Sequence, residues 1–184
     1  MFWRRVLKNP LGSETRFLAV ALVIGFAIAF VLSMWEPSVN DIASSISIEE
    51  VKTMWVPWHP PAKAMVKPWE TFVAPRIIFR VRNRGKKTLR YVAFNAVFLR
   101  KRTEMKLGTA YILTLRDGLN PGKVSEPITM TSDGGYAGTS LKALRENPFW
   151  EPVICRLYVV KGEKIKLIGT FDVENTIEVP DQDN

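Results

Sequence analysis

Residues 17–35 form a run of nineteen residues without a charged side chain, and this run constrains the chain more than any other feature. As an α-helix rising about 1.5 Å per residue, it nearly covers the ~30 Å hydrocarbon core of a bilayer. Arg16 precedes the run, and Trp35 and Glu36 close it. The sequence therefore predicts a single N-terminal transmembrane helix.

The charges beside this run predict its orientation. Four basic residues precede it (Arg4, Arg5, Lys8 and Arg16), and no Lys or Arg follows until Lys52. Basic residues favour the cytoplasmic side, so we expect a cytoplasmic N-terminus and a periplasmic C-terminal domain at the inner (cytoplasmic) membrane. A cleaved signal peptide and a buried globular helix are the alternatives. The first usually has a shorter apolar stretch and a small-residue cleavage site, and the second rarely lacks polar residues over such a length.

Small residues recur along the predicted anchor at a spacing of four. Ala21, Gly25 and Ala29 would line one helical face, which could pack against another transmembrane helix. The expected organisation is then a cytoplasmic tail (1–16), a signal anchor (17–35), a linker (36–44), one extracytoplasmic domain (45–176) and a C-terminal tail (177–184).

Short apolar-alternating runs separated by turn signals predict that this domain is mainly β. The expected strands cover 45–53, 75–83, 88–100, 108–116, 123–131, 152–161 and 164–174, with one short helix near 140–146. Seven strands without βαβ alternation favour an immunoglobulin-like β-sandwich. Strand 88–100 is apolar on both faces, which predicts a central or covered strand.

Two further face assignments follow from alternation. Cys155 shares a face with Val153, Leu157 and Val159, so it is interpreted as a buried core thiol. In the last strand, Ile165, Leu167, Phe171 and Val173 are expected to face inward, with Lys164, Lys166, Thr170 and Asp172 facing outward.

The stretch from Arg80 to Leu99 carries a Val-x-Asn strand end (Val81 to Asn83), a small turn and a long apolar strand, followed by Leu119-Asn120-Pro121-Gly122. This pattern, at about residues 80–122, resembles the FxLYD type of bacterial immunoglobulin-like domain. Arg100 and Lys101 stand where the signature acid of that family follows the apolar strand. The resemblance implies a sandwich fold and a non-enzymatic role.

A proline-rich segment, 54–72, lies between the first two predicted strands and holds three of the six tryptophans. Tryptophan is enriched at protein interfaces and membrane boundaries. The segment either caps the sandwich core, docks on a partner protein or dips into the membrane interface. Its candidate interface residues are Trp55, Trp58, His59, Trp69 and Phe72.

Basic residues are concentrated between Arg76 and Lys106, where eleven oppose the single acid Glu104. Such charges either solubilise exposed strands or form an anionic-binding face. The candidates for that face are Arg80, Arg82, Arg84, Lys86, Lys87, Arg90, Arg100, Lys101 and Arg102. Outside the cytoplasm, anionic lipid or an acidic protein suits them better than nucleic acid, which we do not expect as a partner.

Catalytic signatures are not evident in the sequence. His59 is the single histidine, so a His-dependent triad or multi-histidine metal site cannot form within the chain, and no cofactor or metal is expected. The leading hypothesis is a non-catalytic, membrane-anchored periplasmic subunit that binds a partner in an envelope transport, secretion or assembly complex. A lipid-binding or lipid-transfer component contacting anionic lipids is the main alternative, and a membrane-tethered enzyme is the third.

Overall fold

The computed structural model describes residues 18, 20–27, 37–58, 71–147 and 150–177, which fall in two compact units that divide after Pro37. In the first unit, residues 18 and 20–27 are helical, and their large apolar side chains are exposed. Across the described ranges, no helix combines the length and the apolar character needed to span a bilayer.

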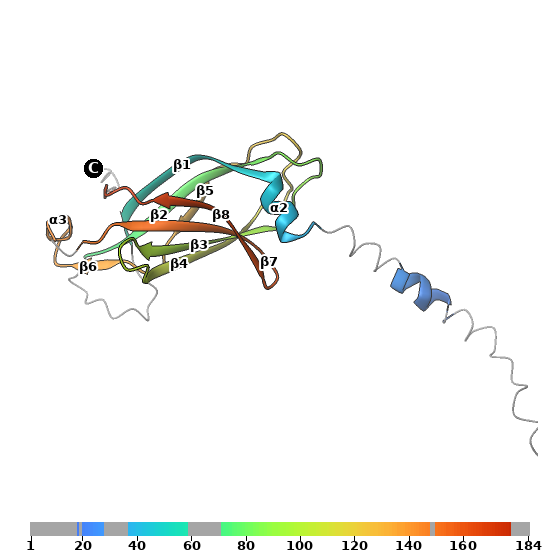
Figure 1. Ribbon diagram of the computed structural model, residues 1–184, viewed down its shortest axis with the longest axis horizontal. Coiled ribbons are helices and arrows are strands. Elements are labelled where there is room, and N and C mark those ends of the chain that lie inside the picture. Colours follow the sequence, from blue (N-terminus) through green and yellow to red (C-terminus); the bar gives the residue numbers. More distant parts are fainter. Residues whose placement is uncertain (1–17, 19, 28–36, 59–70, 148–149, 178–184) are drawn as a thin grey trace, which may run out of the picture. The chain divides into compact units, whose positions relative to one another are not determined.

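The second unit, called here the two-sheet unit, is mainly β and consists of two antiparallel sheets (Figure 1). The first sheet has the order β1-β2-β5, and β6 also pairs with β2: β1 is Ile46–Pro57, β2 Thr71–Asn83, β5 Ile128–Thr131 and β6 Tyr136–Gly138. The second sheet has the order β4-β3-β7-β8: β4 is Lys106–Thr114, β3 Val92–Arg100, β7 Val153–Lys161 and β8 Lys164–Asp172.

The core lies between the inward faces of the two sheets. Phe79 of β2 and Phe94 of β3 are fully buried and meet edge to face, with ring centroids 5.4 Å apart. The predicted alternation of 75–83 is confirmed, because Ile77, Phe79 and Val81 are buried. Strand β3 is central, between β4 and β7, as its apolar composition predicts; its core-facing residues are buried, and those on its other face are buried or partly buried.

Two short helices cap the two-sheet unit at opposite ends (Figure 1). The predicted helix near 140–146 is α3, Leu141–Arg145, which begins after the N-cap Ser140. The other, α2, is Val39–Ser45, and Val39 and Ile42 are buried in the core. A capping box starts it, because Ser38 Oγ accepts from the Asp41 N–H (3.2 Å) and Asp41 Oδ2 accepts from the Ser38 N–H (2.9 Å). Most of the expected linker, 36–44, is therefore a helix that packs on the core.

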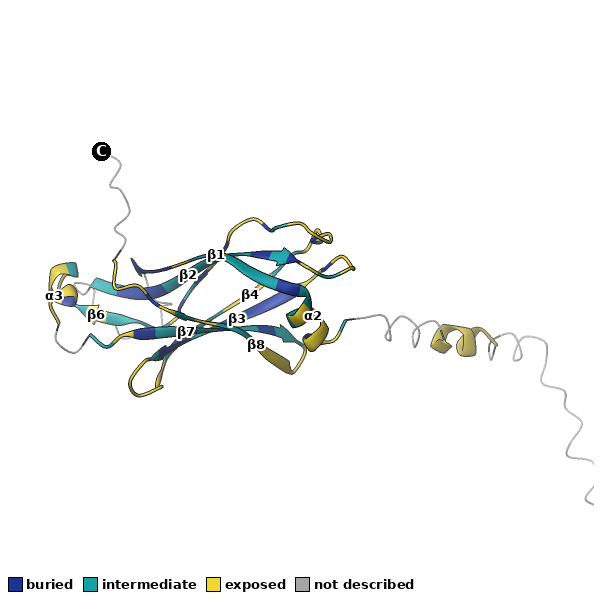
Figure 2. Ribbon diagram, turned by 45° about the horizontal axis from the view of Figure 1, so that its top comes forward, coloured by how far each residue is buried: buried dark blue, intermediate teal, exposed yellow. Residues whose placement is uncertain are grey.

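Strand β8 departs from the predicted alternation. Its register shifts opposite Leu157 and Tyr158, where Leu157 pairs with Gly169 and Tyr158 with Leu167, so Ile168 is an extra residue. A bulge of this kind reverses which parity faces the core. Phe171 and Val173 pack toward the core as predicted, but Ile165 and Leu167 are 60% and 46% exposed. Their inward assignment is wrong, and Figure 2 shows how little of β8 is buried.

Candidate functional site: the outer face of the second sheet

The structure divides the tryptophan residues that were predicted to form an interface. Trp55 is only 1% exposed, and its ring stacks on Tyr136 (centroids 5.4 Å apart) and meets Trp150 edge-on (4.6 Å). This corrects the interface prediction for Trp55, which is a core residue because β1 carries it into the space between the sheets. Trp58 is 37% exposed and Phe72 is partly buried, whereas His59 and Trp69 lie outside the described residues.

The predicted basic face does not form one continuous surface. Arg80 and Arg82 lie on the outer face of the first sheet, where they pair with Glu50 (3.0 Å) and Glu49 (2.7 Å) of β1. The hydrogen bond from Arg82 holds the pKa of the Glu49 carboxyl below its usual value.

The other predicted basic residues lie at the two ends of β3. Arg84, Lys86, Lys87 and Arg90 precede this strand, and Arg100, Lys101 and Arg102 end or follow it. Nine residues at ~3.3 Å each place the strand ends about 26 Å apart. Lys101 pairs with Asp172 (2.6 Å), and the Arg100 guanidinium lies 5.8 Å from the centroid of the Tyr136 ring. The nine residues therefore divide among three locations.

The small residues of the first unit are described only in part. Ala21 and Gly25 are exposed on the helical segment 20–27, and a Cβ added to Gly25 would meet no atom within 4 Å. Ala29 lies outside the described residues.

A different surface emerges from the strand register of the second sheet. Reading across β4, β3, β7 and β8, one row of paired residues consists of Leu113, Ala93, Val160 and Ile165, and the next consists of Tyr111, Asn95, Tyr158 and Leu167. Paired residues on neighbouring strands lie on the same face of a sheet. The core-facing residues of β3 and β7 are their sequence neighbours, so both rows lie on the outside. We call these two rows, together with the adjacent Tyr91, the apolar outer face.

The large side chains of this face are exposed to solvent. Tyr111 is 65% exposed, and Tyr91, Leu113, Ile165 and Leu167 are also exposed, while Tyr158 and Val160 are partly buried. Single exposed apolar residues are ordinary, but here the exposed side chains of β4 and β8 flank the partly buried Tyr158 and Val160 in the same two rows. Aromatic residues, among them tyrosine, are enriched at protein interfaces, and Tyr, Trp and Arg carry much of the binding energy there.

The same sheet becomes charged farther along its strands. The next row consists of Thr109, Val97, Arg156 and Thr170, and Arg156 pairs with Glu104 (2.8 Å). Beyond that row, Asp172 pairs with Lys101. The apolar outer face is therefore confined to the half of the sheet that contains the β7–β8 turn and packs against α2.

Sequence reasoning missed this face, although a signal was present. Strand β4 places apolar residues at both parities, with Ile112 packed on the core and Tyr111 and Leu113 outside. A strand that is apolar on both faces needs a second layer to bury its outer face, and Tyr111 and Leu113 of β4 remain exposed.

Among the described residues, no group of three or more His, Cys, Asp or Glu side chains could hold a metal ion. Cys155 is fully buried, as predicted, and burial raises the pKa of its thiol to about 12. A thiol with this pKa is neutral at physiological pH and packs as a small apolar side chain.

Comparison with known proteins adds little to this description. No protein-family model matches the chain, and no curated protein sequence is similar to it. A crystal structure of a protein from Archaeoglobus fulgidus is similar at a TM-score of 0.34 and 14% identity, over 68% of this chain and 92% of that chain.

Proposed function

We propose that this protein is a non-catalytic, membrane-anchored periplasmic subunit whose apolar outer face binds a partner protein in an envelope transport, secretion or assembly complex. The apolar outer face carries the proposal, because exposed large side chains of β4 and β8 lie in the same two rows as the partly buried Tyr158 and Val160. The predicted anchor, 17–35, supplies the address at the inner membrane.

The finer fold assignment is part of the same proposal. The orders β1-β2-β5 and β4-β3-β7-β8 correspond to strands A-B-E and C′-C-F-G of an immunoglobulin-like sandwich. In such a sandwich the outer face of the C′-C-F-G sheet is free to associate with another domain. This correspondence supports both the fold assignment and the location of the interface.

Charge around the face indicates what kind of partner it fits. The chain segments that border the apolar outer face carry Arg90, Arg116, Lys161 and Lys164 against Asp117 and Glu163. Rim charges steer association and select partners of opposite sign. The partner is therefore a protein with an apolar centre and an acidic rim.

Co-purification from gently solubilised membranes tests this function. The full chain is compared with the double variant Tyr111→Ser/Leu167→Ser, with Thr129→Ala on the exposed outer face of the first sheet as the matched control. We expect the double variant to lose a stoichiometric partner that the wild type and the control retain. Retention of every partner by the double variant would overturn the proposal.

A further inference from the structure

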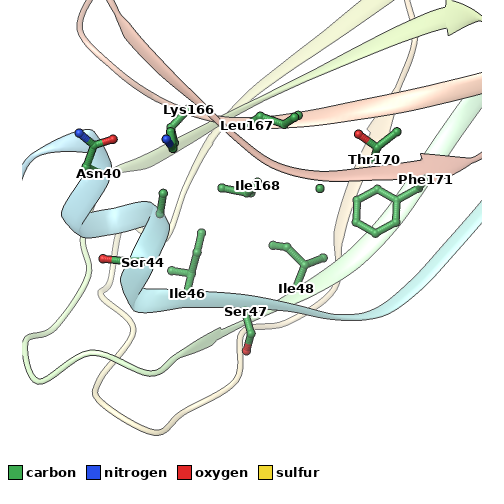
Figure 3. A pocket seen from close by; sticks show the side chains of 12 residues that line it. Asn40, Ser44, Ile46, Ser47, Ile48, Lys166, Leu167, Ile168, Thr170 and Phe171 are labelled. Atoms are coloured by element: carbon green, nitrogen blue, oxygen red, sulfur yellow. The ribbon is translucent and has the colours of Figure 1, made fainter.

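The two-sheet unit is open along one edge, where β1 of the first sheet and β8 of the second lie beside α2. A cleft of about 830 Å³ occupies this edge, and Figure 3 shows its lining. Ile46 and Ile48 point into it from β1, and Ile168 points into it from β8. This volume lies within the ~300–1,000 Å³ typical of small-molecule sites.

The cleft is bounded at both ends. At one end α2 contributes Asn40, Ala43 and Ser44 to its wall. Toward the other end, Thr53 Oγ1 donates to the Asp172 carbonyl (2.9 Å) and accepts from the Glu174 N–H (3.0 Å), which joins β1 to the end of β8. These contacts limit the opening to a slot between the sheets.

The β8 bulge lies in the wall of the cleft. Ile168, the extra residue of β8, is partly buried against the core and lines the cleft together with Ile48 and Phe171. Bulges frequently re-aim a side chain next to a functional site. Ile48, Ile168 and Phe171 thus form an apolar, partly exposed wall in a cleft that Asn40, Ser44, Ser47 and Thr170 also line.

The charge of the cleft lining indicates that a ligand with a negatively charged group would fit it. Its lining residues include one cation, Lys166, and no acid. Among the residues that the structure describes, Lys166 has no ion-pair partner. Its methylene stem can follow the apolar wall while the ammonium stays at the mouth.

We propose that this cleft binds a single long-chain fatty acid, with the acyl chain between Ile46, Ile48, Ile168 and Phe171 and the carboxylate at Lys166. An acyl chain is slim and has no hydrogen-bonding groups to satisfy, which suits the apolar wall formed by these four side chains. An extended peptide would use the backbone edges of β1 and β8 and would leave the apolar side chains between the sheets unused.

Photolabelling of the full chain in nanodiscs of neutral phosphatidylcholine tests the site. The probe is palmitic acid with a diazirine on its chain, and labelled residues are located by peptide mass spectrometry. We expect labelling on residues 46–48 and 168–171 that excess unlabelled palmitate removes. Labelling of the predicted anchor, 17–35, is the internal control for probe dissolved in the bilayer.

Three variants decide whether the cleft itself binds the probe. Ile48→Trp fills the cleft from the β1 wall and Ala43→Phe fills it from the α2 end, and each should reduce cleft labelling at least tenfold, with folding checked by circular dichroism. Lys166→Glu, an exposed change that does not threaten the fold, should weaken competition by palmitate about tenfold. Lys164→Glu, a neighbouring lysine outside the lining, should change it less than twofold.

Several results would overturn the proposal. These are labelling confined to 17–35, cleft labelling that survives both filling variants, and equal labelling by an uncharged hexadecanol analogue. Labelling by photoreactive phosphatidylglycerol but not by palmitate would assign the cleft to a phospholipid instead. Leu167 borders both the cleft and the apolar outer face, but Ile48→Trp, Ala43→Phe and Lys166→Glu leave the apolar outer face unchanged, so this site and the proposed partner site can fail separately.

Discussion

The outer faces of the two sheets differ in whether their side chains find interaction partners within the same sheet. On the first sheet, Arg80 and Arg82 pair with the acids of β1, and Arg76 Nε donates to Thr131 Oγ1 of β5 (2.8 Å). On the second, Tyr111 and Leu167 are exposed to water at the two ends of a row whose middle members, Asn95 and Tyr158, are partly buried. The charged groups of the first face find partners within their own sheet, whereas the exposed apolar side chains of the second face have no protein layer over them in the part of the chain that the structure describes.

This difference shows that a high number of basic residues in the sequence does not make all of them available to bind a partner. The sequence between Arg76 and Lys106 is strongly basic, and that density suggested an anionic-binding face. In the folded unit, cross-strand acids already neutralise Arg80 and Arg82, and exposed pairs of this kind serve mainly to solubilise a sheet. An uncharged surface therefore becomes the better candidate for binding.

The largest expected effect on stability comes from a residue of the core. Trp55→Ala should destabilise the protein by about 3–5 kcal/mol, because it removes a buried ring from the contact with Tyr136 and Trp150. Trp58→Ala, at an exposed position, should change stability by less than about 0.5 kcal/mol. Chemical denaturation monitored by far-ultraviolet circular dichroism measures both, and similar costs for the two would contradict the assignment of Trp55 to the core.

Thiol reactivity compares the two sides of the second sheet. Because burial raises the pKa of Cys155 to about 12, we expect its alkylation at pH 8 to be roughly a thousandfold slower than that of an exposed thiol. The matched reporter is Leu167→Cys in a Cys155→Ala background, which places a thiol on the apolar outer face. Mass spectrometry follows the time course, and fast labelling of native Cys155 would show that this strand opens readily.

Removing the apolar outer face should affect association more than stability. Tyr111→Ser and Leu167→Ser should each change the free energy of unfolding by less than about 0.5 kcal/mol, since both side chains are exposed. Binding of a hydrophobic dye should fall in the double variant and stay unchanged in Thr129→Ala. A loss of several kcal/mol would mean that these side chains pack within the protein, and the face would then be structural.

The smallest effect concerns the ion pairs of the first sheet. The Arg82 hydrogen bond lowers the pKa of Glu49, so this pair stabilises the folded state above the usual carboxyl range, and the contribution is lost as pH falls through the lowered pKa. Glu49→Gln should therefore flatten the acid side of the stability profile slightly. Glu163→Gln, in the β7–β8 turn, is the control, and thermal melts from pH 3 to 7 measure both. An unchanged profile in Glu49→Gln would show that the pair adds nothing.

Much of the two-sheet unit could be predicted from alternation. The strands at 75–83 and 152–161 could be predicted because apolar residues such as Phe79 and Leu157 recur at every second position, with arginines such as Arg80 and Arg156 between them. Strand β6 is only three residues long, too short for any period to be read. Helix α2 was not predicted, because its seven residues make too few turns to show an apolar period, although Ser38 and Asp41 form a capping-box pattern.

The candidate sites were harder to predict, for a physical reason. Which parity of β8 faces the core depends on the bulge at Ile168, and a bulge is set by pairing with β7. Alternation alone therefore put Ile165 and Leu167 inside. The apolar outer face also needs four strands in register, and their order comes from tertiary packing.

Site-specific photocrosslinking on the two outer faces tests the proposed binding face most directly. Benzoylphenylalanine replaces Tyr111 on the second sheet or Thr129 on the first, in the full chain and in intact cells. We predict one crosslinked species of discrete mass from position 111, lost when Leu167→Ser is added, and none from position 129. Equal crosslinking from both positions, or none from position 111, would contradict the assignment of the second sheet as the binding face.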